Sequence, residues 1–311
     1  MASPAIPEDH RSGFVGLIGR PNVGKSTLLN AYLKQNIVPV SFRPQTTRRR
    51  QLGILTLPEV QLIFVDTPGF HQAHHQLGER MNAYAQAVLE DVDIVLAIFD
   101  ISHTPQPEDY IVIEKLQELD PSKALLVALN KVDLLSDNER THRQEHFQSL
   151  MPIGKVIVIS AAEGENREQL LNNLIEELPL GPRYYPEEEI TDFTERQIAE
   201  DLIRAAAMQS LREEVPYAID VRVDEYLERG QRGAFISATI FVERDSQKGI
   251  LIGKGGKMMR KIGTRARREI ESMSGRRVYL ELRVKVLKGW RNDSAALARF
   301  GYPNIDTKQS T

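Results

Sequence analysis

The sequence of 311 residues contains no cysteine. This absence excludes a disulfide framework, a zinc site with cysteine ligands and thiol catalysis, and it favours a reducing compartment. No apolar stretch reaches the roughly 18 residues that a transmembrane helix needs, so none is expected. Residues 1–10 have neither a basic start nor an apolar segment, and we do not expect them to act as a signal peptide.

The composition is that of a globular protein, with 41% hydrophobic and 27% charged residues. The length suggests two domains. The net charge of −3 hides an uneven distribution of charge along the chain. Residues 1–246 carry 24 basic and 38 acidic side chains, a net charge of −14, whereas residues 247–311 carry 16 and 5, a net charge of +11. This concentration of positive charge predicts an anionic partner, with nucleic acid as the first candidate.

The first half of the chain alternates apolar runs with stretches of helical spacing. The apolar runs are typical of parallel strands buried on both faces, and they cover residues 13–19, 60–66, 94–100, 124–130 and 156–160. The helical spacing covers residues 76–91, 107–119, 137–150 and 166–178. This alternation predicts an α/β fold with a doubly wound, mostly parallel sheet. Polar residues that end the strands are candidate site residues, because ligands bind at the carboxyl ends of such strands.

The pattern changes after residue 179. Residues 180–192 combine proline, glycine, tyrosine and acids, which predicts a linker. Residues 193–214 have helical spacing, and strict alternation over 217–225 and 234–242 predicts an antiparallel hairpin. A helix after Gly256 and a strand over residues 278–286 complete a separate α+β module.

Residues 19–26 match the phosphate-binding pattern G-x-x-x-x-G-K-[ST] after a predicted strand and at the start of a helix. Its glycines, Gly19 and Gly24, let backbone N–H groups surround phosphates. Lys25 adds a positive charge for the β- and γ-phosphates, and Ser26 offers its hydroxyl to Mg²⁺. The motif therefore predicts a nucleoside triphosphate site.

Three further motifs follow predicted strands. Asp66 can hold Mg²⁺ through water, and Gly69 leaves a backbone N–H to meet the γ-phosphate. Asp133 accepts hydrogen bonds from the two N–H donors of the guanine edge, which adenine lacks, so the motif predicts GTP over ATP. Ser160 and the two alanines after it supply backbone N–H donors for the guanine oxygen.

These four motifs in this order resemble the translation-factor-like GTPases. The resemblance implies that residues 41–50 are switch I, and that Thr47, or alternatively Thr46, joins Ser26 and Asp66 as a Mg²⁺ ligand. The expected catalytic residues are Lys25, Thr47, Gly69 and Asn22. The residues expected to contact GTP are Gly19, Arg20, Pro21, Asn22, Val23, Gly24, Lys25, Ser26, Thr27, Asp66, Thr67, Pro68, Gly69, Asn130, Lys131, Asp133, Ser160, Ala161 and Ala162.

Two departures from the Ras-like pattern bear on hydrolysis. Phe70 stands where Ras-like GTPases carry the glutamine that orients the attacking water, so slow intrinsic hydrolysis is expected. Resemblance to GTPases with such a hydrophobic substitution and a P-loop asparagine implies that Asn22 helps to bind K⁺ near the phosphates. The basic run 48–50 is either a contact to phosphate or RNA, or a solvated loop. Three histidines, His71, His74 and His75, are expected to be exposed to solvent and not to bind metal.

The C-terminal module carries a G-x-x-G loop at Gly253–Gly256, and every charged residue from 247 to 268 is basic. The glycines allow close approach of a sugar-phosphate backbone. On the next helix an apolar stripe, which predicts packing on the sheet, lies beside a basic stripe at the same spacing. The expected RNA-binding residues are Gly253, Lys254, Gly255, Gly256, Lys257, Lys261, Arg265 and Arg268. Trp290 is predicted either to stack on a base or to cap the last strand. For Gly263 both close packing and RNA approach stay open.

This α-β-β-α-α-β order with its G-x-x-G loop resembles a type II KH domain, and the whole chain resembles the Era family of GTPases. The most specific parts are the sequence from 178 to 192 and the L-K-G-W at residues 287–290. The resemblance implies an N-terminal tail (1–12), a GTPase domain (13–179), a linker (180–192), a type II KH domain (193–290), and a C-terminal helix and tail (291–311).

The resemblance to the Era family also implies a function. A cytoplasmic GTPase switch would bind GTP or GDP with Mg²⁺, bind the 3′ end of 16S rRNA in the small ribosomal subunit, and assist assembly of that subunit, with hydrolysis timing its release. A peripheral membrane contact is associated with the family, and no obligate protein partner is predicted. The alternatives are a non-enzymatic GTP-dependent RNA-binding scaffold and an RNA-modification GTPase, which would need a further catalytic domain.

Overall fold

The computed structural model describes residues 9–40, 43, 45–151, 154–230 and 233–304. Parts of three predictions lie outside these residues: the N-terminal tail at 1–8, switch I at 41, 42 and 44, and the C-terminal tail at 305–311. The chain forms two compact units. The first unit comprises residues 1–34, 50–72 and 81–192, and the second unit comprises residues 35–49, 73–80 and 193–311.

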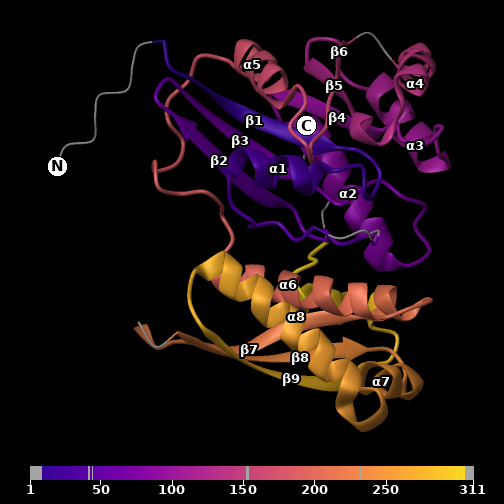
Figure 1. Ribbon diagram of the computed structural model, residues 1–311, viewed down its shortest axis with the longest axis vertical. Coiled ribbons are helices and arrows are strands. Elements are labelled where there is room, and N and C mark those ends of the chain that lie inside the picture. The colour runs from indigo at the N-terminus through magenta and orange to yellow at the C-terminus, as the bar shows by residue number, and fades with distance from the viewer. Residues whose placement is uncertain (1–8, 41–42, 44, 152–153, 231–232, 305–311) are drawn as a thin grey trace. The chain divides into compact units, whose positions relative to one another are not determined.

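The first unit is built on a six-stranded sheet with the order β2-β3-β1-β4-β5-β6 (Figure 1). All neighbours are parallel except β2 and β3, which are antiparallel. This confirms the doubly wound, mostly parallel sheet. The strands are β1 (Arg11–Ile18), β2 (Gln51–Leu57), β3 (Val60–Asp66), β4 (Ile94–Asp100), β5 (Ala124–Asn130) and β6 (Lys155–Val158). Every residue of β3 and β4 is buried, as their continuous apolar sequences require.

The helices of the first unit begin at recognisable signals. Pro107 opens one helix inside a capping box between Gln106 and Asp109, and Ser136 pairs with Glu139 in the same way before the next. The helices are α1 (Lys25–Leu33), α2 (Gln76–Asp91), α3 (Pro107–Gln117), α4 (Asp137–Leu150) and α5 (Arg167–Glu177), with α2 divided between the two units.

Residues 180–192 lie along the β2–β3 edge of the first unit. The backbone N–H of Ile54 donates to the carbonyl of Ile190 at 2.9 Å, and that of Leu52 donates to Asp192 at 2.8 Å. The backbone N–H of Tyr184 donates to the side chain of Gln61 at 2.8 Å. These contacts satisfy polar groups at the β2–β3 edge, so the segment is part of the packed unit.

The second unit contains a three-stranded sheet with the order β7-β8-β9, covered on one face by α6 and α8, which lie side by side in Figure 1. The hairpin β7–β8 is antiparallel and β9 runs parallel to β8. This confirms the α-β-β-α-α-β order. The elements are α6 (Glu195–Ser210), β7 (Asp220–Glu228), β8 (Ala234–Val242), α7 (Asp245–Ile252), α8 (Lys257–Ser274), β9 (Val278–Val286) and α9 (Ser294–Arg299).

Two features of the second unit differ from the sequence prediction. The first strand of its hairpin begins at Asp220 rather than 217, because residues Val215–Ala218 form a 3-10 turn whose second residue is a proline. Trp290 is fully buried, and its indole N–H donates to the carbonyl of Ala218 at 3.1 Å. Its ring meets Phe300 edge-on. The prediction that Trp290 stacks on a base is therefore wrong, and the side chain belongs to the core.

Candidate nucleotide and RNA sites

In the P-loop of the first unit (residues 19–26), backbone carbonyls of the loop itself hold Lys25 in place. The Lys25 ammonium donates to the carbonyls of Gly19 at 2.9 Å and Arg20 at 3.0 Å. Burial lowers the pKa of Lys25 to about 8, although Asp66 opposes the shift. A phosphate neighbour would raise this pKa again, so the ammonium that is already present near neutral pH would be stabilised by a bound anion.

The two Mg²⁺ ligands predicted in the first unit meet in space. The Ser26 hydroxyl donates to the Asp66 carboxylate at 3.0 Å, although the two residues belong to α1 and β3. A hydroxyl and a carboxylate are hard oxygen donors of the kind that Mg²⁺ prefers. The donor pair in the first unit therefore fits Mg²⁺.

Asn130 ties two nucleotide loops together. Its amide donates to the carbonyl of Val23 at 2.7 Å, and its carbonyl oxygen accepts from the backbone N–H of Ala161 at 2.8 Å. A Cβ at Gly24 would lie 2.2 Å from this amide, and Gly24 has a φ of +108°. Sequence reasoning placed Asn130 in the site but did not find this bridging role, which depends on contacts between three separate segments.

The residues predicted to read guanine follow the ends of β5 and β6. Asp133 is exposed at the start of a 3-10 turn (Val132–Leu134), where its carboxylate is accessible to a base. Ser160 is buried, and its hydroxyl accepts the backbone N–H of Glu163 at 2.9 Å, which fixes the loop that carries Ala161 and Ala162. The structure thus brings these residues to the edge of the sheet where the P-loop lies.

Asp100, at the end of β4, joins two residues of the predicted nucleotide site. Lys131 donates to its carboxylate at 2.7 Å, and the guanidinium of Arg20 lies 3.4 Å from the same oxygen. Burial would raise the pKa of Asp100, but hydrogen bonds from Lys131 and Ser102 hold it below its usual value. Arg20 also donates to Asp109 at 3.0 Å. The charges of Arg20 and Lys131 are therefore balanced by protein carboxylates.

The two residues that follow Gly69 are buried. A Cβ at Gly69 would lie 2.4 Å from the backbone nitrogen of Pro21, so only glycine fits between this loop and the P-loop. Phe70 is 3% exposed in the main hydrophobic cluster, so its side chain offers nothing to an attacking water. His71 is buried as well, with Nδ1 2.9 Å from the Gly69 carbonyl. The expectation of an exposed His71 is wrong, because its ring is hydrogen-bonded to the Gly69 carbonyl and the residue directly follows the buried Phe70.

The other two histidines belong to the second unit. His74 is exposed, as expected, whereas His75 is half-buried and accepts the backbone N–H of Gly78 at 3.1 Å. Burial lowers the pKa of His75. Among the described residues, no group of three or more His, Cys, Asp or Glu side chains is placed to hold a metal ion.

Residues 45–49 of the predicted switch I segment belong to the second unit. Arg204, on α6, donates to the carbonyl of Thr46 at 3.0 Å. Arg48 is fully buried, and Arg49 lies 2.8 Å from Asp201. Neither interpretation of the basic run 48–50 is right for the first two arginines, and only Arg50 is exposed. The acidic partners lie about 150 residues away in sequence, which hid the pairing from sequence reasoning.

The G-x-x-G loop of the second unit joins α7 to α8. Gly253, Gly255 and Gly256 all have positive φ values, and a Cβ at Gly255 or Gly256 would meet no atom within 4 Å. The backbone is therefore open to a ligand at these two positions. Arg260 donates to the carbonyl of Gly255 at 2.7 Å and fastens the loop to the first turns of α8.

The two stripes predicted on α8 have the expected burial. Ile262, Ala266, Ile270 and Met273 are buried, and Met258 is half-buried. The basic stripe is exposed along its whole length: Lys257, Lys261, Arg265 and Arg268. A groove of about 310 Å³ runs between α8 and β9 and is lined by Gly263, Arg267 and Leu282 among others. A Cβ at Gly263 would lie 3.6 Å from Leu282, an ordinary contact, so close packing does not require a glycine there.

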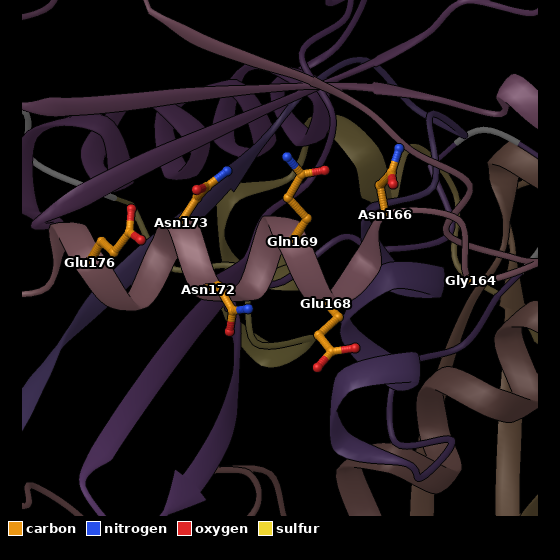
Figure 2. Close-up of a pocket in the computed structure, with 7 residues that line it drawn as sticks. All are labelled: Gly164, Asn166, Glu168, Gln169, Asn172, Asn173 and Glu176. Carbon is orange, nitrogen blue, oxygen red and sulfur yellow. The ribbon is translucent and has the colours of Figure 1, made fainter.

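A second hollow, of about 560 Å³, lies along α5 and begins at Gly164, just after the predicted guanine loop (Figure 2). Its lining consists of amides and acids without a cation. Figure 2 shows Glu168 and Asn172 pointing to the opposite side of the helix from Gln169 and Asn173. The polar groups therefore do not converge on one ligand.

Comparison with known proteins decides the family. A family model described as "50S ribosome-binding GTPase" matches residues 14–131, and a KH domain model matches residues 214–291. A crystal structure of Era in complex with MgGDPNP and nucleotides 1506–1542 of 16S ribosomal RNA is 35% identical, with a TM-score of 0.87, and the match covers 95% of this chain and 100% of that chain. The chain belongs to the Era family of GTPases.

A structure of an Aquifex aeolicus Era variant bound to GDP and AlF₄⁻ is similar to the same degree, with 35% identity and a TM-score of 0.87 over 94% of this chain and 100% of that one. As an Era-family member, the chain is a P-loop GTPase that hydrolyses GTP and carries a C-terminal KH domain. No helix among the described residues is long and apolar enough to cross a membrane.

Proposed function

We propose that this Era-family GTPase binds the 3′ end of small-subunit rRNA, assists assembly of that subunit, and is released when GTP is hydrolysed. The observation that carries the proposal is the presence of a convergent GTP site and an open G-x-x-G loop beside an exposed basic helix in one chain. The similar Era structure that contains both MgGDPNP and 16S nucleotides supports it.

In the nucleotide site, residues 19–27 surround the phosphates, and Asp133 with Ala161 and Ala162 reads guanine. Mg²⁺ would be held by Ser26 and Asp66, with Thr47 (or Thr46) completing the set, and would neutralise charge on the β- and γ-phosphates. Lys25 adds its own positive charge, which a bound phosphate would stabilise by raising the pKa of the ammonium. Asn130 holds the phosphate and guanine loops in one geometry.

Hydrolysis in the absence of a partner is slow in this proposal, because Phe70 is buried and orients no water. The backbone N–H of Gly69 is the expected contact to the γ-phosphate on this loop. A slow intrinsic rate suits a timer that acts only after the RNA complex has formed.

In the KH domain, Gly253–Gly256 would clamp the sugar-phosphate backbone, and Lys254, Lys257, Lys261, Arg265 and Arg268 would supply positive charge. Bases would enter the groove between α8 and β9, whose described lining contains no acid. The proposed domain limits are 13–179 for the GTPase, 180–192 for the linker and 193–290 for the KH domain.

The proposed location is the cytoplasm, where ribosomes assemble. The exposed basic stripe of α8 supports a peripheral contact with anionic lipid as a second role. Flotation with vesicles of anionic and of neutral lipid tests it, and equal recovery with both vesicles would reject the contact.

The central experiment measures phosphate release and RNA affinity on the same preparations. We expect the wild-type chain to release phosphate from GTP and to bind a 16S rRNA 3′-end oligonucleotide. Lys25→Ala should abolish release while RNA binding survives, and reversal of charge at Lys254 and Lys257 should do the opposite. A chain that binds RNA and GTP but releases no phosphate would be the non-enzymatic scaffold.

A crosslinking experiment in cell extract tests the partner. The proposal expects a small-subunit rRNA 3′ end as the main crosslinked RNA. Recovery of diverse messenger RNA instead would overturn the ribosomal assignment while leaving the GTPase intact.

A further inference from the structure

The buried carboxylate of Asp100 lies outside the motifs of the nucleotide site, yet it gathers two cations that belong to them. Asp100 ends β4 and is 2% exposed. Lys131 donates to its Oδ2 atom at 2.7 Å, and the guanidinium of Arg20 lies 3.4 Å from the same atom. The backbone N–H of Ser102 donates to Oδ1 at 3.0 Å, and the Ser102 hydroxyl donates to Oδ1 as well. Partners on both oxygens therefore fix the orientation of the carboxylate.

The backbones of β4 and β5 bring Asp100 and Lys131 together. Asp100 and Asn130 are partners in the parallel register of these strands, and the N–H of Ile101 donates to the carbonyl of Asn130 at 3.0 Å. Lys131 comes directly after this pair and has a φ of +69°, a left-handed conformation that residues other than glycine seldom adopt. The chain therefore turns sharply at Lys131, and the ammonium of its side chain returns to the neighbouring strand, where Asp100 accepts it.

Lys131 lies in the chain between two residues that bear on the guanine base. Asn130 accepts the backbone N–H of Ala161 at 2.8 Å, and Asp133 is the predicted acceptor for the guanine edge. A base paired with Asp133 would lie beside Lys131, whose apolar four-carbon stem can cover the flat face of the base. A free lysine samples many rotamers, whereas one whose ammonium is held at Asp100 has lost that freedom before the base arrives.

The distribution of charge makes Lys131 depend on Asp100 more than Arg20 does. Burial would raise the pKa of Asp100, but Lys131, Ser102 and Arg20 hold it below its usual value, so the carboxylate is ionised near neutral pH. Arg20 has a second carboxylate partner, Asp109, at 3.0 Å. Among the ion pairs of the described residues, Lys131 has Asp100 as its one acidic partner. The position of the Lys131 side chain therefore rests on Asp100.

We propose that Asp100 is a positioning residue of the GTP site, which tethers Lys131 so that the lysine stem covers the guanine base. The inference rests on the proposed function of Asp133 as the guanine acceptor, and it adds a residue that acts through Lys131 and not by contact with the nucleotide. The tether serves binding and not the chemical step, because the groups expected at the phosphates, such as Lys25, are held by other partners. Loss of the tether should therefore raise the KM for GTP and leave kcat unchanged.

The test measures the dissociation of fluorescent GDP from the full chain with Mg²⁺, together with steady-state phosphate release from GTP. Asp100→Asn keeps the shape of the side chain but removes its charge. It should speed GDP dissociation and raise the KM for GTP by roughly 3- to 30-fold, as loss of a charged hydrogen bond does, with kcat within about twofold of wild type. Lys131→Met keeps an apolar stem but lacks the ammonium, and it should show an effect of the same size.

A double-mutant cycle separates positioning from a merely structural role. If Asp100 acts through Lys131, the double variant Asp100→Asn with Lys131→Met should release GDP no faster than either single variant. On an Arg20→Met background, Asp100→Asn should keep its full effect. The matched control is Glu176→Ala, which removes the carboxylate of another lysine ion pair in the first unit, that with Lys155, and should leave GDP dissociation and KM unchanged. Thermal unfolding of each variant checks that it is folded.

The outcomes separate this inference from the proposed function. If Asp133→Ala binds GDP as tightly as wild type, the proposed guanine site itself fails. If Asp133→Ala loses GDP while Asp100→Asn or Lys131→Met releases it as slowly as wild type, the guanine site stands and the tether is overturned. Additive losses in the double variant, or loss of the Asp100→Asn effect on the Arg20→Met background, would also overturn it, because the carboxylate would then act without Lys131. Should Asp100→Asn fail to fold, Lys131→Met alone decides between these outcomes.

Discussion

Arg48 is fully buried in the second unit, with its guanidinium 3.8 Å from the carboxylate of Asp220. It also donates to the carbonyl of Ile219 at 2.7 Å. Through these carboxylate and carbonyl partners, the buried cation of Arg48 fixes its part of the chain to the residues at the start of β7. Thr47, the expected Mg²⁺ ligand, is joined to Arg48 by one peptide bond, so a nucleotide-dependent change at Thr47 has a direct covalent route to this cluster.

Replacing Arg48 by methionine should destabilise the second unit by about 3–5 kcal/mol, because it leaves Asp220 buried without that charge partner. Trp290 is the one tryptophan in the sequence and is buried in this unit, so its fluorescence during denaturation reports on this unit. The control is Arg50→Ala, an exposed neighbour that should change stability by less than about 0.5 kcal/mol. Equal midpoints for the two variants would contradict a structural role for Arg48.

Gly263→Ala should stabilise α8 by roughly 0.5–1 kcal/mol and weaken RNA binding. The added methyl group makes only an ordinary contact with Leu282, but it projects from a residue that lines the groove. Trp290 fluorescence measures the stability, and titration with the rRNA oligonucleotide measures the affinity. Gly249→Ala on α7, where a Cβ meets no atom within 4 Å, should stabilise without changing RNA affinity. Unchanged RNA affinity in Gly263→Ala would show that RNA does not approach this position.

Most of the secondary structure could be predicted because its signals are local. The bounds of β3, β4 and β5 follow from apolar runs that end in a polar residue, and those of α2 and α4 follow from helical spacing. β2 was missed although it is as long as β3, because it lies at the edge of the sheet, where antiparallel pairing with β3 defines it.

In the candidate sites too, the residues with a local sequence signal could be predicted and those that depend on distant partners could not. Short motifs with fixed spacing identify Lys25, Ser26 and Asp66, so these residues could be predicted from the sequence. The burial of Arg48 and Trp290 could not, because each depends on partners that are distant in sequence or lie on another element. Sequence patterns report local geometry well, but long-range pairing of charged and aromatic side chains leaves no periodic signal.

Affinity for GDP should fall as the pH rises above about 8, because Lys25 has a pKa of about 8 in the free protein. A phosphate neighbour raises that pKa, so binding above pH 8 takes up a proton and weakens by up to about tenfold per pH unit. Titrations with fluorescent GDP at constant Mg²⁺ between about pH 7.5 and 9.5 measure the slope. Lys25→Arg keeps its charge over this range and should show no slope of this origin.

Lys25 makes the stability of the protein depend on pH with the opposite sign to the affinity for GDP. The folded pKa of Lys25 is about 8 and the ordinary value is 10.5, so the unfolded chain binds more protons between these values. The free energy of unfolding therefore gains a contribution from Lys25 that rises with pH across this window. Denaturation of the nucleotide-free chain should show this rise in wild type, and Lys25→Met should lack it. A wild-type curve that parallels the variant would contradict a lowered pKa.

GTP hydrolysis should run faster in potassium than in sodium salts of equal ionic strength, because Phe70 supplies no hydrogen bond and a cation near the phosphates stabilises developing charge. Asn22 has a φ of 66°, a left-handed conformation that asparagine tolerates, and its amide oxygen is the expected K⁺ ligand. Asn22→Ala should abolish the difference between the two salts, whereas Asn172→Ala, an exposed amide on α5, should keep it. Steady-state phosphate release measures both rates. Equal rates for wild type in the two salts would remove K⁺ from the proposed chemistry and leave Mg²⁺ and Lys25 as the source of positive charge at the phosphates.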